Sequence, residues 1–143
     1  MKISTRGRYA LRMMIDIGMH DAAGPVRIKD VAKRQGISVK YLEQIVAILT
    51  KAGYVNSVRG PQGGYRLAMA PKDYTAGMIL RLTEGDFAPV ACCNDDYECP
   101  QKQDCVTIRL WRELDIAINQ VLDKYTLEDL IGWQTQAFDD YVI

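Results

Sequence analysis

Apolar residues recur at three- and four-residue steps in three early segments of the chain, which predicts three amphipathic helices. The segments are residues 5–22, 28–35 and 38–51. Gly24 and Pro25 end the first helix, and Gly36 marks a tight turn between the second and the third. Ser38 is placed to cap the third helix, because its hydroxyl can accept a hydrogen bond from an amide of the first turn.

An extended pattern follows the third helix. Residues 54–58 and 65–67 carry the tyrosine, valine and leucine that strands favour, and a glycine-rich segment at residues 59–64 joins them. This arrangement predicts a β-hairpin with a flexible, basic tip. The order of helix, short helix, tight turn, longer helix and hairpin is typical of a winged helix-turn-helix, in which the hairpin is the wing.

The second half of the chain predicts three more helices. The first is capped by Thr75 and ends near Gly85, the second covers residues 106–124, and a short third helix at residues 126–133 packs back on the body. The long helix carries an apolar stripe made of Leu110, Leu114, Ile118 or its neighbour Ala117, and Val121. Because the first half already forms a small core, this stripe predicts pairing with the same helix of a second subunit.

The distribution of charge supports a division between the two halves. The chain has 143 residues and a net charge of zero, with 18 basic and 18 acidic side chains. Residues 1–72 contain 13 basic and 4 acidic side chains, a net charge of +9, whereas residues 73–143 contain 5 and 14, a net charge of −9. Such a split indicates that the first half contacts a polyanion and that the second half has another task.

The predicted partner of the basic half is double-stranded DNA. The start of the third helix offers hydrogen-bonding groups to the major groove, namely Ser38, Lys40, Tyr41, Glu43 and Gln44. On the wing, Arg59 and Gln62 lie where a guanidinium and an amide can reach phosphates or a narrow minor groove. Ser38 could instead be only a cap, and Tyr41 could only pack. A homodimer would place two such helices on the half-sites of a palindromic promoter site.

The predicted fold is therefore mainly α with a small β-hairpin wing. A winged helix-turn-helix DNA-binding domain covers residues 1–72. Residues 73–143 form a second unit, with a cysteine-containing sensor loop and a long C-terminal dimerisation helix. No stretch of about 18 apolar residues and no cleavage site follows the basic start of the chain, so we expect a cytoplasmic protein without a membrane partner.

All four cysteines lie within one loop: Cys92, Cys93, Cys99 and Cys105. In a reducing compartment such cysteines are more often metal ligands or reactive thiols than structural disulfides. Five residues separate each of the last three from the next, whereas two residues separate the paired cysteines of zinc ribbons. A compact run of thiolates suits an iron–sulfur cluster, because its irons favour soft ligands. Zinc, a redox thiol switch and chance clustering remain open at this point.

The chain resembles the Rrf2 family of transcriptional regulators, and within it the iron–sulfur cluster regulators. The resemblance extends from residue 1 to about residue 131 and rests on the opening MKISTRGRYA, on residues 36–38, 41–44 and 59–65, and on the three evenly spaced cysteines. It implies a homodimeric winged-helix transcription factor whose cluster controls which DNA sites are bound. By motif position, the ligands would be Cys93, Cys99 and Cys105, and a [2Fe-2S] cluster is favoured over a [4Fe-4S] cluster.

The chain departs from this resemblance at one ligand. Cluster regulators of the family have a histidine three residues after the last cysteine, where this chain has Ile108, and its single histidine, His20, is expected on the surface near the end of the first helix. Some relatives use an N-terminal carboxylate of the partner subunit, but this chain has Arg8 there. Cys92 is an available substitute. A group from the other subunit, glutathione or water would also complete the site.

Two other functions compete with cluster sensing. One is a cluster-free regulator of cysteine metabolism, signalled by a partner enzyme or by thiol oxidation, although such members of the family lack the cysteine triad. The other is an electron carrier, which needs neither a wing nor a helix-turn-helix. The sequence predicts no enzyme, because it contains no phosphate-binding loop and no HExxH motif.

Overall fold

The structure is a computed structural model that describes residues 1–101 and 103–141. Its helices are α1 (Thr5–His20), α2 (Ile28–Gln35), α3 (Val39–Lys51), α4 (Ala76–Glu84), α5 (Thr107–Lys124) and α6 (Leu127–Tyr141). The two strands are β1 (Val55–Val58) and β2 (Gly64–Leu67), and the short 3-10 turns are η1 (Asp21–Ala23), η2 (Pro71–Asp73) and η3 (Ala91–Cys93). The prediction of a mainly α fold with a β-hairpin wing is confirmed.

Side-chain caps fix where the helices begin. The Ser38 hydroxyl accepts a hydrogen bond from the Tyr41 amide at 3.2 Å, and the Thr75 hydroxyl accepts one from the Met78 amide at 3.0 Å. Both caps match the sequence prediction. Gly36 ends α2 with a φ of +65°, a left-handed conformation that glycine adopts without strain. These signals set the turn between α2 and α3.

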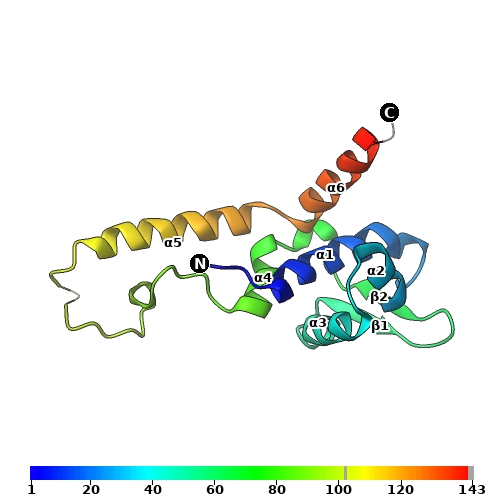
Figure 1. Ribbon diagram of the computed structural model, residues 1–143, viewed down its shortest axis with the longest axis horizontal. Coiled ribbons are helices and arrows are strands. Elements are labelled where there is room, and N and C mark those ends of the chain that lie inside the picture. Colours follow the sequence, from blue (N-terminus) through cyan, green and yellow to red (C-terminus); the bar gives the residue numbers. More distant parts are fainter. Residues whose placement is uncertain (102, 142–143) are drawn as a thin grey trace.

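The core of the winged-helix body lies around α1, which packs against α2, α3, α4, α6 and β2 (Figure 1). Fully buried side chains from five elements meet there: Met13, Met14, Ile17, Val31, Leu42, Ile45, Leu49, Val55 and Ile79. Tyr74 is also fully buried, and its hydroxyl donates to the Tyr54 carbonyl at 2.6 Å. Burial raises the pKa of Tyr74, so the phenol stays protonated at neutral pH.

The wing is an antiparallel hairpin whose register runs from Val55 opposite Leu67 to Val58 opposite Gly64. A bridge to the segment before α2 extends it, since Val26 and Tyr65 exchange two backbone hydrogen bonds of 2.8 Å. Gly64 allows this approach, because a Cβ at that position would lie 2.5 Å from the Val26 carbonyl oxygen. Backbone hydrogen bonds therefore connect the wing to the helix-turn-helix.

Helix α5 leaves the body and extends toward the cysteine loop at the far end of the molecule (Figure 1). Helix α6 differs from the prediction, because it continues to Tyr141 rather than ending near residue 133. Its first turns pack on the body, with Leu127 buried and Ile131 against Gly18, whereas Phe138 is exposed. In the described part of the chain, no helix is both long and apolar enough to cross a membrane.

The division at residue 72 remains a prediction. Helix α4 comes from the second half of the sequence but packs on α1. Ile79 of this helix lies in the same apolar cluster as Met13, which belongs to the first half. The basic and acidic halves therefore share one core.

Candidate DNA-binding surface and cysteine loop

The exposed face of α3 carries three of the seven residues that the sequence assigned to DNA. Lys40, Glu43 and Gln44 are exposed on its first two turns. Ser38 is exposed as well, and its hydroxyl is engaged in capping the helix. An exposed helix face with both donors and acceptors has the dimensions and chemistry that the DNA major groove accepts.

Tyr41 is half-buried and joins α3 to α1. Its ring meets that of Tyr9 edge to face, with centroids 5.7 Å apart and an interplanar angle of 81°. The Arg12 guanidinium lies 5.4 Å from the centroid of the same Tyr9 ring. Tyr41 therefore has a packing role and holds α3 in place beside the exposed residues.

The wing tip presents Arg59 and Gln62 to solvent. The sequence predicts a flexible tip, but its backbone has an anchor that the sequence reasoning missed, because the Arg27 guanidinium donates to the Pro61 carbonyl. Arg27 directly precedes α2, so the tie holds the tip beside the helix-turn-helix. Arg27 follows the turn at Gly24 and Pro25 and precedes the first residue of α2. Nothing in the sequence at this position indicates a contact with the wing.

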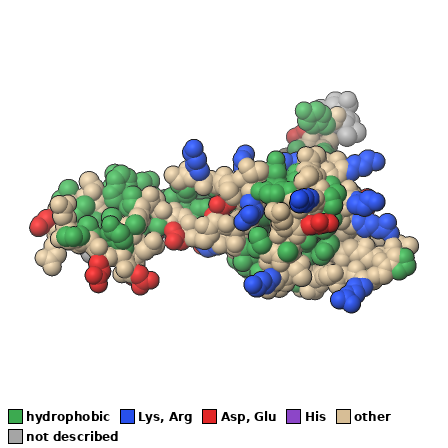
Figure 2. Space-filling view, turned by 60° about the horizontal axis from the view of Figure 1, so that its bottom comes forward, with side chains coloured by type: hydrophobic (Ala, Val, Ile, Leu, Met, Phe, Trp, Pro, Cys, Tyr) green, Lys and Arg blue, Asp and Glu red, His purple; other side chains and the backbone are tan. Residues whose placement is uncertain are grey.

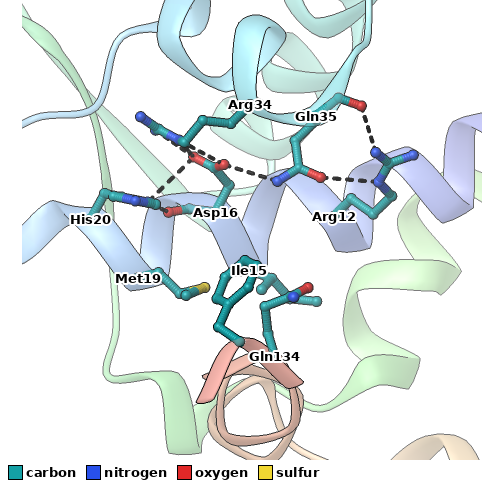
Figure 3. Close-up of a pocket in the computed structure, with 9 residues that line it drawn as sticks. Arg12, Ile15, Asp16, Met19, His20, Arg34, Gln35 and Gln134 are labelled. Carbon is teal, nitrogen blue, oxygen red and sulfur yellow. Dashed lines mark hydrogen bonds and ion pairs between the residues drawn. The ribbon is translucent and has the colours of Figure 1, made fainter. Parts of the chain in front are cut away.

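A buried carboxylate holds the helix-turn-helix against α1. Asp16 has a 1% exposed side chain and accepts hydrogen bonds from Arg34 at 2.7 and 3.0 Å and from Gln35 at 3.0 Å (Figure 3). The Arg12 guanidinium in turn donates to the Gln35 side chain at 3.0 Å. Sequence reasoning missed this role, although an acidic residue within the apolar stripe of α1 was the available signal.

The same cluster explains the single histidine. His20 is 42% exposed, as predicted, and its Nδ1 lies 2.8 Å from the Asp16 carbonyl oxygen. Hydrogen bonds to Asp16 raise the pKa of Arg34, so this guanidinium stays charged. A cleft of about 560 Å³ opens beside these groups, with Ile15, Met19, Gln134 and Phe138 on its other walls (Figure 3).

Charge is distributed over the molecule as the sequence predicted. On the face shown in Figure 2, lysine and arginine side chains are concentrated on the winged-helix body, whereas acidic side chains are more frequent on the narrower lobe that holds the cysteine loop. Anionic DNA would be attracted to the first and repelled by the second.

Three of the four cysteines line one small hollow of about 10 Å³. Cys92, Cys99 and Cys105 line this hollow together with Tyr97 and Ile108. Cys93 lines a separate, open hollow of about 660 Å³ with acidic neighbours, Asp86, Asp95 and Asp96 among them. Among the residues that the structure describes, no group of three or more potential ligands is close enough to hold a metal ion.

The donor chemistry of the first hollow nevertheless suits iron. All four cysteines are free thiols and partly exposed. Cys105 Sγ lies 3.2 Å from the Thr107 hydroxyl, and the hydrogen bond between these two groups lowers the pKa of Cys105, with help from the Ile108 amide. The thiolate is the form that binds metals. Ile108, at the position of the family histidine, faces the same hollow as Cys92.

The outer face of α5 is apolar. Leu110, Leu114 and Val121 are 52%, 41% and 56% exposed, whereas Ile118 is half-buried. Ala117, the alternative to Ile118, is exposed and completes a stripe of three- and four-residue steps. The opposite side of the helix carries its half-buried residues Ile108, Trp111, Asp115, Asn119 and Leu122. The stripe is therefore free to meet a second copy.

These features define the class of protein. A helix-turn-helix followed by a paired wing, with a basic body and an exposed recognition helix, is a winged helix-turn-helix of the kind found in transcriptional regulators.

Comparison with known proteins identifies the family within that class. The model of the Rrf2 family, described as an iron-dependent transcriptional regulator, matches residues 3–132. Protein rrf2 of Nitratidesulfovibrio vulgaris is 45% identical over 131 residues, which cover 92% of this chain and 87% of that protein. The chain belongs to the Rrf2 family of DNA-binding transcriptional regulators, and its relatives are regulators rather than enzymes, as the sequence predicted.

Two solved structures represent different branches of the family. CymR, the global cysteine regulator of B. subtilis, has a TM-score of 0.78 and 41% identity, covering 93% of this chain and 98% of its own. IscR of T. potens has a TM-score of 0.76 and 41% identity, covering 96% of this chain and 90% of its own. By TM-score and identity the chain resembles CymR and IscR about equally, so these likenesses do not distinguish the two kinds of signal.

Proposed function

We propose that this protein is a cytoplasmic, homodimeric regulator that binds a palindromic promoter site and senses iron–sulfur cluster or redox status through its cysteine loop. The observation that carries the sensing half is the hollow shared by Cys92, Cys99 and Cys105. Soft thiolates are typical ligands of iron. Because no group of three ligands in the described residues is close enough to hold a metal ion, the loop would have to bring its thiols closer together to bind a cluster. The basic body and the recognition helix support the DNA-binding half.

Cys93, Cys99 and Cys105 would hold the cluster by their motif spacing, and Cys92 would supply the fourth thiolate in place of the family histidine. Cys93 lines a separate hollow, so the loop would have to rearrange to bring it to the other three. Cys92 and Ile108 line the same hollow, which supports this substitution. We favour a [2Fe-2S] cluster over a [4Fe-4S] cluster. When bound, it would supply one-electron redox chemistry, and the loop would change shape when the cluster is gained or lost. The chain itself contributes an acidic, partly exposed loop.

The test is an anaerobic preparation of the full chain. We expect a coloured protein that contains iron and sulfide, and we expect Cys93→Ala, Cys99→Ala and Cys105→Ala each to abolish colour and metal. Visible absorption, iron and acid-labile sulfide are measured on each variant. Cys92→Ala decides the fourth ligand, because a normal cluster in this variant would exclude it. A wild-type protein that stays colourless and iron-free after reconstitution would overturn cluster sensing.

A second candidate is a cluster-free regulator like CymR, signalled by a partner enzyme or by thiol oxidation. The structural likeness to CymR favours it, together with the three thiols at one hollow and the Thr107 contact of Cys105. This alternative predicts an iron-free protein whose DNA binding changes with the redox state of the thiols. The same preparation therefore separates the two candidates.

The wing contact gives a separate prediction for DNA binding. Arg59→Ala is expected to weaken binding to a palindromic site about 10-fold and to reduce the slope of log K against log salt by about one, because one phosphate contact and its released counterion are lost. Fluorescence anisotropy over a salt series measures both. Arg112→Ala, which removes an exposed arginine from α5, should change neither value. An unchanged slope for Arg59→Ala would remove the wing from the interface.

A further inference from the structure

The C-terminal end of α5 is fastened to the winged-helix body by backbone. The Ala76 amide donates to the Tyr125 carbonyl at 2.8 Å, and the Leu127 amide donates to the Tyr74 carbonyl at 2.9 Å. Both bonds lie at the end of the helix nearest the body. Farther along, α5 also packs on α4 and on the short turn η3 of the cysteine loop.

One arginine on α4 adds the contacts that determine the direction of α5. Arg81 donates to both carboxylate oxygens of Asp123, at 2.7 and 3.0 Å, and to the side-chain oxygen of Asn119 at 2.7 Å. Asp123 and Asn119 are four residues apart and so lie on successive turns of one face. A planar guanidinium bound at two turns fixes the orientation of the helix, which a single contact would not do.

The geometry around this arginine is close-fitting. A Cβ on Gly77 would lie 2.6 Å from Arg81 Nη1 and would overlap the Asp123 carboxylate, so glycine leaves the space in which the pair meets. Hydrogen bonding between the partners raises the pKa of Arg81 and lowers the pKa of Asp123. Both groups are therefore charged throughout the pH range in which the protein would work.

Arg81 is also fixed to the DNA-binding body. Its helix buries Ile79 and Leu80 in the core. At the end of the same helix, the Glu84 carboxylate accepts hydrogen bonds from the amide and the hydroxyl of Ser4, the residue that caps α1. Helix α4 therefore moves together with α1 and, through Tyr9 and its partner on α3, with the recognition helix.

We propose that Arg81 is a positioning residue that fixes the direction of α5 relative to the winged helix, and thereby the distance between the two recognition helices of the dimer. This inference rests on the proposed function, because it needs the dimer and its DNA site. The 18 residues of α5 span about 27 Å. A change of direction of about 10° would move its far end by about 5 Å, which exceeds the roughly 3.4 Å rise of one base pair.

The contacts of Arg81 continue toward the cysteine loop. The Asn119 amide donates to the Asp115 carbonyl at 2.8 Å and to its carboxylate at 3.1 Å. A hollow of about 390 Å³ is lined by Arg81, Asp115, Asn119 and Asn94, the residue after Cys93. A rearrangement of the loop therefore reaches the same contacts that orient α5.

The test measures how strictly the protein reads the spacing of half-sites. A palindromic site is selected by the wild-type protein from a random DNA pool, and its central spacer is then shortened or lengthened by one and two base pairs. We expect the wild type to lose at least about 10-fold in affinity on changing the spacer, and Arg81→Ala to bind the whole series within about 3-fold. Affinity for a single half-site should be the same for both proteins.

Three further variants separate orientation from charge and from folding. Arg81→Lys keeps the charge but cannot span both turns, so it should relax the spacing preference as well. Asn119→Ala removes one of the two turns, leaves the ion pair intact and should also relax it. The double variant Arg81→Asp with Asp123→Arg should restore much of the preference. Dimer mass should be unchanged, and the melting temperature should fall by no more than about 5 °C.

The outcomes are distinct. If Arg81→Ala or Arg81→Lys keeps the wild-type spacing preference, or if the wild type itself has none, Arg81 does not set the geometry of the dimer. If the wild type selects no DNA or is monomeric, the proposed function fails together with this inference. If Arg81→Ala does not fold, Asn119→Ala decides the question.

Discussion

Substituting arginine for Leu114 is expected to convert the proposed dimer into monomers. Leu114 lies in the middle of the exposed apolar stripe of α5, between Leu110 and Val121. In a dimer with two-fold symmetry the substitution would place two unpaired cations in one apolar seam, and burying such charges costs several kcal/mol for each ion. The mass measured by sedimentation should fall from twice 16.1 kDa to 16.1 kDa.

The DNA affinity of this variant should fall with its mass. A dimer binds its second half-site intramolecularly, which raises affinity by a factor on the order of 10² to 10⁴ over a single winged helix. We therefore expect Leu114→Arg to bind the palindromic site at least about 100-fold more weakly, while its affinity for one half-site stays near that of the wild type. Fluorescence anisotropy on both DNAs measures this difference.

Ile116→Arg is the matched control. Ile116 is 56% exposed on the same helix, but two residues beyond Leu114 it lies on the other side. The same charge added there should leave the dimer and its DNA binding intact. If Ile116→Arg separates the subunits and Leu114→Arg does not, the seam lies on the opposite face from the one we infer.

Local signals explain why most elements could be predicted from the sequence. Helix α2 has the predicted bounds because an apolar period ends at Gly36, and α3 and α4 begin at the caps predicted for Ser38 and Thr75. Each of these signals acts within a few residues of the chain. Helix α6 was predicted too short because its apolar period weakens after Trp133, although no glycine or proline follows before Tyr141.

Contacts between distant residues could not be predicted in the same way. Asp16 and Arg34 are 18 residues apart, and Arg81 and Asp123 are 42 apart. A periodic pattern shows which face of a helix is buried, but it does not show which charged residue on another helix will meet it. Asp16 was visible as an acid in an apolar stripe, whereas nothing near Arg81 marked its partner.

The cysteine loop shows the same limit at the candidate site. Sequence spacing selects Cys93, Cys99 and Cys105, whereas the hollow of three thiols contains Cys92 in place of Cys93. Neighbouring residues in a loop point in different directions, and no period specifies which one faces a given hollow. The spacing thus located the loop, and its ligand set stays a prediction that the alanine variants test.

Removing the carboxylate of Asp16 is expected to have the largest effect on stability among the substitutions considered. Asp16→Ala deletes a side chain that is 1% exposed and that accepts hydrogen bonds from both Arg34 and Gln35. Breaking a buried ion pair typically costs 3–5 kcal/mol. Arg34 is 36% exposed and can turn to water, so we expect a lower cost of about 2–3 kcal/mol in the free energy of unfolding.

The loss should be independent of pH over the neutral range. Hydrogen bonding to Asp16 raises the pKa of Arg34, so this guanidinium stays charged throughout the neutral range and its part of the contribution is lost only in strong base. Because His20 Nδ1 lies 3.6 Å from the Asp16 carboxylate, both proteins also carry His20→Ala. Urea unfolding at pH 6, 7 and 8, at one fixed protein concentration, should then give the same difference between the two.

A double-mutant cycle attributes this stability to the contact itself. If the pair acts as we infer, Asp16→Ala and Arg34→Ala are coupled, and the double variant should be about 1–2 kcal/mol more stable than the sum of the single effects implies. Asp139→Ala, which removes an exposed acid from α6, should stay within about 0.5 kcal/mol of the wild type. Additive single effects, or a loss for Asp16→Ala no larger than that of the control, would show that α2 is held on α1 by apolar packing alone.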